Sequence, residues 1–373
     1  MLTNLQALLR KHKKAFIVFL ILIFFAVFGR LFFEAIRWSP VFVDFFFKRE
    51  IELKKTDKRV NILILGIGGE RHDGPLLTDT IIYAAVDPIK LKTTLVSLPR
   101  DLWAPELKAK INTAYAYGED KQKGGGIILA KAVVEKILGQ PVNYVIRVDF
   151  RGFIQAIDLL GGIDVDVEQS FDDYEYPIVG KEVDTCGFEG EEFEKRATAS
   201  AQLEAFPCRY QHVSFEKGLQ HMDGETALFF VRSRHAKGDE GTDMARSKRQ
   251  EKVITAFKEK VFSTGTLLNP MKVLSLYDTF QASIDTDIQK SEYDDFLRLF
   301  RKMQYAKTES IVFFYATENE KEIQTLLINP KPSEEYNNQW VIIPRAGNGN
   351  FSEIQNYASC VLIKDLKDAC PIR

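Results

Sequence analysis

One apolar run limits the folds open to this chain. The stretch RVNILILG, residues 59–66, is continuously apolar and ends in glycine. Such a strand is buried on both faces, so both faces of its sheet need a covering layer. Strand patterns follow at 79–87 and 93–99, and helical patterns at 124–139 and over RGFIQAIDLLGG. The alternation predicts an α/β fold, a layered α-β-α domain with a central mixed β-sheet flanked by helices.

The N-terminal segment predicts a membrane anchor that precedes this domain. Basic residues precede AFIVFLILIFFAVFG, residues 15–29, and RLFFEAIRW extends the run with few charges. No small-residue cleavage site follows, so an uncleaved transmembrane helix over 15–37 is favoured over a signal peptide or a buried soluble helix. The flanking charges place the N-terminus in the cytoplasm and the bulk of the chain outside it. We therefore predict a single-pass protein of the cell membrane.

The remaining chain divides by composition. Residues 1–14 would be a cytoplasmic tail and residues 38–58 a membrane-proximal linker. A domain of residues 59–265 carries the alternating pattern, with residues 170–212 as a polar surface insertion. Residues 266–373 carry further helix and strand patterns and are expected to pack on that domain.

The four cysteines fall into two local pairs. Cys186 and Cys208 lie in the polar segment, and Cys360 and Cys370 lie near the C-terminus. This spacing suggests two short-loop disulfides, which agrees with export from the cytoplasm. No C-x-x-C occurs and the nearby histidines lack zinc-ligand spacing, so no zinc site is expected.

Arginines are concentrated in VRSRHAKGDEGTDMARSKRQ, residues 231–250, although the formal net charge of the chain is only −2. Arg246 continues the apolar stripe of a predicted helix near its positive N-terminal end, where an inward arginine needs an anion. Arg232 and Arg234 end the preceding helix and could converge on one ligand if the helix unwinds there. A set of solvated arginines with surface ion pairs is the alternative.

Two further stretches place charges at strand ends. In LGIGGERHDGPLLTDT, residues 65–80, Asp79 opens a strand, as a hard-metal ligand or as a turn-capping residue. In SLPRDLW, residues 97–103, Arg100 and Asp101 follow a strand at the edge where open α/β sheets build sites, although such a turn pair is also common. Together with the arginine stretch, these residues suggest a pyrophosphate site with arginines for the anion and carboxylates for Mg²⁺.

A family resemblance joins these stretches. The ordered set is NILILG…TDT, SLPRD, KINTAYAYG, VDFRGF, LGGIDVDV, G-x-x-A-L-x-F-x-R-S-R-H and D-x-x-R-S-x-R-Q. It resembles the LytR-CpsA-Psr family of cell-envelope proteins over roughly residues 60–260. The resemblance implies a glycopolymer phosphotransferase of cell wall assembly. Its members move a glycopolymer, as its sugar-1-phosphate, from a polyprenyl pyrophosphate carrier to a peptidoglycan hydroxyl.

The resemblance also implies roles for individual residues. The implied catalytic set is Asp79, Arg100, Asp101, Arg232, Arg234 and Asp243. The implied phosphate-binding set is Arg100, Arg232, Arg234, Arg246 and Gln250, and the metal set for Mg²⁺ is Asp79 and Asp73. Asp101 and Asp243 would position arginines, or one would act as base. Many family members have a second aspartate where this chain reads GIGGE, so Asp73 or Glu70 would have to replace it.

Two other functions fit the same residues. One is a pyrophosphatase that uses water as the acceptor. The other is a non-catalytic or regulatory envelope protein that binds lipid-linked glycan. The expected partners are a polyprenyl pyrophosphate-linked glycan, a peptidoglycan acceptor and the membrane. Nucleic acid is not expected, because the net charge is low and the arginine stretch would lie outside the cytoplasm.

Overall fold

The computed structural model describes residues 51–69, 74–181, 183–199, 201–267, 275–276, 279, 283–313, 315–317, 325–364 and 370. The predicted transmembrane helix over 15–37 lies outside these residues. Within the described part, every helix is too short or too polar to span a bilayer. The chain divides into two compact units, Met1–Leu53 with Gln289–Leu299 and Lys54–Ile288 with Phe300–Arg373.

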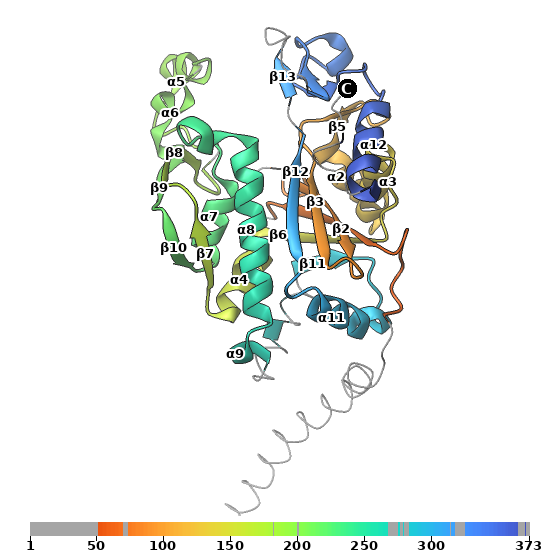
Figure 1. Cartoon of the computed structure of the whole chain (residues 1–373). Coiled ribbons are helices and arrows are strands. Elements are labelled where there is room, and N and C mark those ends of the chain that lie inside the picture. The colour runs from red at the N-terminus through yellow and green to blue at the C-terminus, as the bar shows by residue number, and fades with distance from the viewer. Residues whose placement is uncertain are drawn as a thin grey trace, which may run out of the picture. The chain divides into compact units, whose positions relative to one another are not determined.

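A six-stranded sheet lies at the centre of the larger unit, with the order β11-β6-β1-β2-β3-β12 (Figure 1). The strands are β1 (Val60–Ile67), β2 (Thr78–Asp87), β3 (Lys92–Ser97), β6 (Tyr144–Asp149), β11 (Ile284–Thr286) and β12 (Lys307–Val312). β1 pairs parallel with β6 and antiparallel with β2, so the predicted mixed sheet is confirmed. β11 and β12 come from the C-terminal segment, which thereby supplies both edges of the sheet.

Helices α2 (Ala114–Lys121), α3 (Gly125–Leu138) and α12 (Ser352–Ser359) cover one face of this sheet (Figure 1). α3 ends at Gly139 as predicted, since this residue has φ 62° and donates its N–H to Glu135. Strand side chains such as Leu63 and Tyr83 share one buried core with Val134 and Ile137 of α3. This packing covers one of the two faces of β1.

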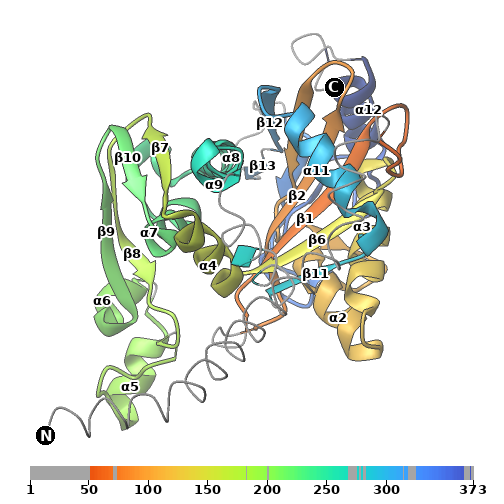
Figure 2. The ribbon, with the colours of Figure 1, turned by 90° about the horizontal axis from the view of Figure 1, so that it is seen from below.

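A second layer contains α4 (Phe150–Leu160), α7 (Gly224–Arg232) and α8 (Asp243–Val261), which lie between the central sheet and two small sheets (Figure 2). The small sheets pair β7 (Ile163–Val167) with β10 (Gly218–Met222), and β8 (Phe171–Pro177) with β9 (Tyr210–Phe215). Phe171, Phe230 and Val253 belong to the core between them. Side chains cap the N-termini of α7 and α8, because Asp223 accepts from Thr226 N–H and Thr242 accepts from Ala245 N–H.

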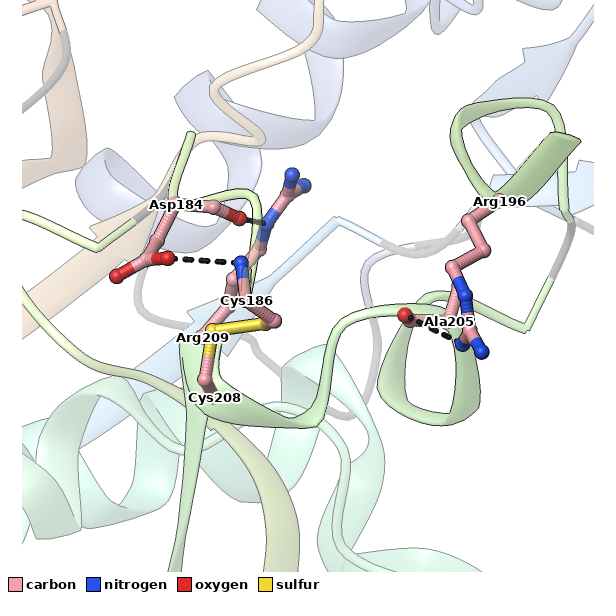
Figure 3. Close-up of a disulfide and its surroundings, with 6 residues drawn as sticks. All are labelled: Asp184, Cys186, Arg196, Ala205, Cys208 and Arg209. Carbon is pink, nitrogen blue, oxygen red and sulfur yellow. Dashed lines mark hydrogen bonds between the residues drawn. A yellow bond between two sulfur atoms is a disulfide. The ribbon is translucent and has the colours of Figure 1, made fainter. Parts of the chain in front are cut away.

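The segment between β8 and β9 carries the first disulfide, Cys186–Cys208 (Figure 3). Arg209 lies beside it and donates from Nε to the carbonyl of Asp184 at 2.7 Å. The second predicted disulfide, Cys360–Cys370, is also present. The remaining elements are β4 (Trp103–Ala104), β5 (Ala109–Lys110), η1 (Ile111–Thr113), α5 (Gly190–Ala197), α6 (Gln202–Ala205), η2 (Pro207–Arg209), η3 (Gly238–Gly241), α9 (Thr264–Leu267), η4 (Lys290–Glu292), α11 (Tyr293–Lys302), β13 (Tyr315–Thr317), β14 (Leu327–Asn329), η5 (Glu334–Tyr336), β15 (Ile343–Pro344) and η6 (Cys360–Lys364).

Candidate active site

A row of alternating charges lies at one end of the central sheet. Asp79 is the second residue of β2 and Arg100 follows β3. Because these two strands are antiparallel, both residues lie at the same end of the sheet. Arg100 Nη1 donates to Asp79 Oδ1, and Arg100 Nε lies 3.5 Å from Asp101 Oδ2. Lys110 Nζ extends the row, 2.8 Å from Asp101 Oδ1.

The charge state of Arg100 is fixed by these neighbours. Burial alone would lower the pKa of the Arg100 guanidinium, but contacts with Asp79 and Asp101 raise it above its ordinary value. About a third of the Arg100 side chain, 35%, remains exposed. This end of the sheet therefore presents the permanently cationic guanidinium of Arg100, held by two carboxylates, to any ligand that binds there.

Helix α8 reaches the same end of the sheet. Gln250 Nε2 lies 3.5 Å from the hydroxyl oxygen of Thr80, the residue after Asp79. Gly66 at the end of β1 packs against the same side chain, and a Cβ there would lie only 3.0 Å from Thr80 Cβ. The end of β1 and the arginine-rich stretch, which are far apart in the sequence, therefore meet at Thr80.

The segment after α7 is unwound, which is the condition on which Arg232 and Arg234 could converge on one ligand. The helix ends at Arg232, and Ser233 has an extended ψ of 132°. Arg232 Nη1 donates to the hydroxyl of Tyr176 at 3.2 Å, and its guanidinium carbon lies 4.3 Å from the ring centroid of Phe150. Burial raises the pKa of Tyr176 to about 12, against the opposing effect of Arg232, so the phenol stays neutral. Arg232 thus lies against aromatic rings from α4 and β8.

A buried carboxylate that sequence reasoning missed shapes the same segment. Asp173 is fully buried, and its Oδ2 accepts from the hydroxyl of Ser233, from Arg234 N–H at 3.0 Å and from His235 N–H at 3.1 Å. Asp173 lies on β8, in the range 170–212 interpreted as a polar insertion. The signal was the alternation in FDDYEYP, which puts this aspartate on the same strand face as the apolar Phe171.

Arg249 is the other residue with an unpredicted role. Its side chain is 3% exposed and donates to the carbonyls of Phe230 at 2.9 Å and Ser233 at 2.7 Å. It also pairs with the Glu240 carboxylate at 2.9 Å. Arg246, which the helical spacing predicts as the inward arginine, is only half-buried. The guanidinium of Arg249 therefore ties α8 to the end of α7 and to η3.

The other predicted site residues have simple placements. Arg234 lies two residues after the end of α7 and is half-buried, and Asp243 is the first residue of α8. Arg246 and Gln250 lie in the first turns of α8, on the helix whose Gln250 contacts Thr80. Asp73 and Glu70 lie outside the described residues.

The residues at Asp79 fit a magnesium ion. A carboxylate oxygen is a hard ligand, and Mg²⁺ is usually held by one or two carboxylates together with substrate phosphates. Asp79 supplies one such carboxylate, and the cationic Arg100 beside it could bind a phosphate. Elsewhere in the described chain, the one group of three potential ligands is Asp184, Cys186 and Cys208, and its two cysteines are joined as a disulfide.

Known proteins resemble this chain in sequence and fold. A Bacillus cereus protein named polyisoprenyl-teichoic acid–peptidoglycan teichoic acid transferase TagU is 26% identical over 256 residues, 68% of this chain and 67% of the relative. The protein of the same name from Bacillus mycoides is 28% identical over 257 residues, 67% of this chain and 68% of the relative. The crystal structure of B. subtilis TagV superposes with a TM-score of 0.51 at 23% identity, covering 83% of this chain and 98% of TagV.

The family model named "LytR_cpsA_psr family" matches residues 44–341, which include every residue of the charged row described above. Its limits contain β1, β2, β3, α7 and α8 and the residues that meet at Thr80. The chain belongs to the LytR_cpsA_psr family, and the names of its relatives identify it as an enzyme of the transferase type.

Proposed function

We propose that this protein transfers a glycopolymer, as its sugar-1-phosphate, from a polyprenyl pyrophosphate carrier to a hydroxyl of peptidoglycan. The relatives are named as teichoic acid transferases that act on peptidoglycan, which supports this reaction class. The observation that carries the proposal is the row Asp79–Arg100–Asp101, which α8 joins through Gln250 and Thr80. A cation held by carboxylates at the exposed ends of β2 and β3 suits a pyrophosphate.

The arginines would bind the pyrophosphate. Arg100, Arg232 and Arg234 would neutralise phosphate oxygens, with Arg246 and Gln250 at the start of α8 completing the pocket. The rings of Phe150 and Tyr176 both lie within 5.5 Å of the Arg232 guanidinium and hold it in place, so less of its side-chain freedom is lost on binding. Mg²⁺ on Asp79 would supply further charge neutralisation at the pyrophosphate when it is bound.

The chemical step would be a displacement at phosphorus. The acceptor hydroxyl oxygen forms a bond to the phosphorus that carries the sugar, and the bond from that phosphorus to polyprenyl phosphate breaks. The leaving polyprenyl phosphate keeps the electron pair. The hydroxyl proton passes to a carboxylate, for which Asp101 is the described candidate in the charged row and Asp243 the alternative. The arginines stabilise the charge that develops on the phosphate oxygens.

The proposed location of the reaction, outside the cytoplasm, rests on the membrane anchor predicted in the N-terminal segment. An anchor over residues 15–37, with the N-terminus in the cytoplasm, would hold the catalytic domain of residues 59–265 outside the membrane. Both the lipid-linked donor and the peptidoglycan acceptor would then lie on the same side as the site. The two disulfides support this location, because such bonds persist in oxidising compartments.

The test combines the purified chain with Mg²⁺, a polyprenyl pyrophosphate-linked sugar and peptidoglycan fragments, with products identified by mass spectrometry. We expect a phosphodiester-linked product that Asp79→Ala and Arg232→Ala abolish. Arg345→Ala is the matched control, because Arg345 pairs with Glu353, at 3.0 Å, and is not a member of the charged row. Free sugar phosphate alone would indicate a pyrophosphatase, and tight lipid binding without any product would indicate a binding protein.

A further inference from the structure

The end of the sheet opposite the charged row exposes apolar side chains. The hairpin between β2 and β3 presents Ile89, 65% exposed, and Leu91, 45% exposed. Leu91 accepts a hydrogen bond from Lys307 N–H at 3.0 Å, and Tyr305, just before Lys307, is 91% exposed. Three large apolar or aromatic side chains thus lie near one another in water at this end of the molecule.

This end is separated from the candidate active site by the length of β2. Asp79 stands near the start of the strand and Asp87 at its end, eight residues later. At ~3.3 Å per residue the two are about 26 Å apart. The exposed apolar group is therefore no part of the pyrophosphate site.

Basic residues surround these apolar side chains. Residues 54–59, 87–92 and 305–309 contain seven lysines and arginines against three acidic residues. Of the seven, Arg59 is buried, and Lys92 and Lys307 pair with Glu309. Strand pairing brings the first two segments together, since Val60 lies opposite Val86. A small cavity between them is lined by Arg59, Ala85, Asp87, Lys90, Lys92, Thr94 and Leu362. The surface formed by the three segments, here called the hairpin face, is apolar at its tip and cationic around it.

The chain enters the domain at this same end. Residues 54–59 lead directly into β1, and the predicted transmembrane helix ends at residue 37. A stretch of the length of residues 38–53 reaches at most about 55 Å when fully extended. The hairpin face therefore belongs to the part of the domain that the predicted anchor tethers most closely to the bilayer.

The composition of the hairpin face favours a membrane over a protein partner. In PIKLK, residues 88–92, the exposed Ile89 and Leu91 flank Lys90, whose long side chain can reach headgroup phosphates while the apolar residues enter the interface. Tyrosine is also enriched at membrane interfaces. The cores of protein–protein interfaces, in contrast, are depleted in lysine.

We propose that the hairpin face docks on the surface of an anionic lipid bilayer, with Ile89 and Leu91 among the headgroups. The inference rests on the membrane anchor that the proposed function requires. Docking orients the domain, because the Asp79 end of β2 then points away from the bilayer. The hairpin face thus fixes the height and direction in which the site meets the cell wall.

Two isoleucines allow a matched test in the full chain. Ile89 in the hairpin is 65% exposed and Ile128 on α3 is 63% exposed. Since all four native cysteines form disulfides, Ile89→Cys or Ile128→Cys adds one thiol for an environment-sensitive fluorophore. Each labelled chain is reconstituted into vesicles of phosphatidylcholine with phosphatidylglycerol, and quenching by brominated lipid and by aqueous iodide is measured. We expect at least roughly twofold more lipid quenching at position 89 than at 128, decreasing at high salt.

The other outcomes separate the inference from its premise. A chain that floats with the vesicles but shows equal quenching at both positions overturns docking and leaves the anchor standing. A chain that does not float overturns the anchor, and the docking inference fails with it. Protection of position 89 from iodide without quenching by brominated lipid indicates a protein partner or a second copy, which also overturns docking.

A functional measurement gives a second, independent readout. Ile89→Asp with Leu91→Asp replaces both apolar tips with charges that an anionic surface repels. We expect the rate of transfer from a donor embedded in vesicles to change, because the distance between the site and the bilayer is no longer fixed. Transfer from a short-chain soluble donor should stay unchanged, since neither residue lies in the charged row. Ile128→Asp is the control and should change neither rate. Equal loss with both donors would overturn the docking role.

Discussion

Asp173 on β8 accepts a hydrogen bond from the hydroxyl of Ser233, and the same oxygen accepts from the backbone N–H groups of Arg234 and His235. A single fully buried carboxylate thereby organises the three residues that follow Arg232. Its second oxygen accepts from Glu175 N–H at 2.9 Å. β8 is therefore part of what presents the arginines, in addition to being the start of a disulfide-linked segment.

Removal of this carboxylate should disturb both stability and donor binding. Asp173→Ala leaves the buried Ser233 hydroxyl and the N–H groups of Arg234 and His235 without their acceptor, which we expect to lower the free energy of unfolding by about 3 kcal/mol. Because the Arg232–Arg234 segment loses its support, the KM for the lipid-linked donor should rise about tenfold at a temperature where the variant is folded, a loss of ~1.4 kcal/mol. Urea unfolding and initial-rate kinetics check the two effects.

The conservative variant distinguishes positioning from general damage. Asp173→Asn keeps one acceptor oxygen in the same place, so it should recover part of the donor affinity. A purely structural role would instead lower the amount of folded enzyme and leave the KM of the remaining folded fraction unchanged.

Much of the fold could be predicted from the sequence, because its elements have strong local patterns. The apolar run of β1, the Gly139 cap of α3 and the Asp223 cap of α7 each act over a few residues. The roles of Asp173 and Arg249 could not be predicted in this way. Both depend on partners 9 to 62 residues away, and a buried charge in a polar stretch looks like a surface residue until its partners are known.

Arg249 and Arg246 should respond differently to the same substitution. Arg249→Met leaves the carbonyls of Phe230 and Ser233 without their donor and breaks the ion pair with Glu240, so we expect a loss of about 3 kcal/mol in the free energy of unfolding. Arg246→Met removes a half-buried arginine and should cost less stability but more donor affinity. Urea midpoints and donor binding of both variants test this contrast. Equal unfolding losses would contradict the structural role of Arg249.

The first disulfide should stabilise its own segment rather than the site. Cys186 and Cys208 are 22 residues apart. Closing a loop of that length lowers the entropy of the unfolded chain, which stabilises the folded state by about 3 kcal/mol. Cys186→Ser with Cys208→Ser should therefore speed proteolytic cleavage between residues 178 and 209. Transfer activity should remain, because β8 and β9 stay paired outside the loop. Cys360→Ser with Cys370→Ser is the control, and it should leave cleavage of the 178–209 segment unchanged.

Glu309 should give a pH-dependent contribution to stability. Lys307 lies 2.6 Å and Lys92 2.9 Å from its carboxylate, and these contacts lower the pKa of Glu309 below its usual range. A carboxyl with a depressed folded pKa stabilises the fold above its unfolded pKa of ~4.3, and this contribution disappears as the pH falls through the folded value. Glu309→Gln should thus cost up to about 1 kcal/mol at neutral pH and almost nothing in strong acid. Urea unfolding across this pH range checks the sign, and a cost that grows toward acid would contradict it.

Gly118 sets helix propensity against packing. Alanine is favoured over glycine inside a helix by about 1 kcal/mol, so propensity alone predicts that Gly118→Ala stabilises α2. A Cβ there would lie 2.3 Å from the carbonyl oxygen of Gly125, a backbone atom that cannot rotate away. Separating α2 from α3 should outweigh the propensity gain and destabilise the protein by about 1–3 kcal/mol. Gly265→Ala is the control, since the nearest atom to its Cβ, Ser263 Oγ, is 4.0 Å away, and it should be neutral or stabilising. Thermal unfolding of both variants decides the matter, and a stabilised Gly118→Ala protein would show that the two helices do not approach this closely.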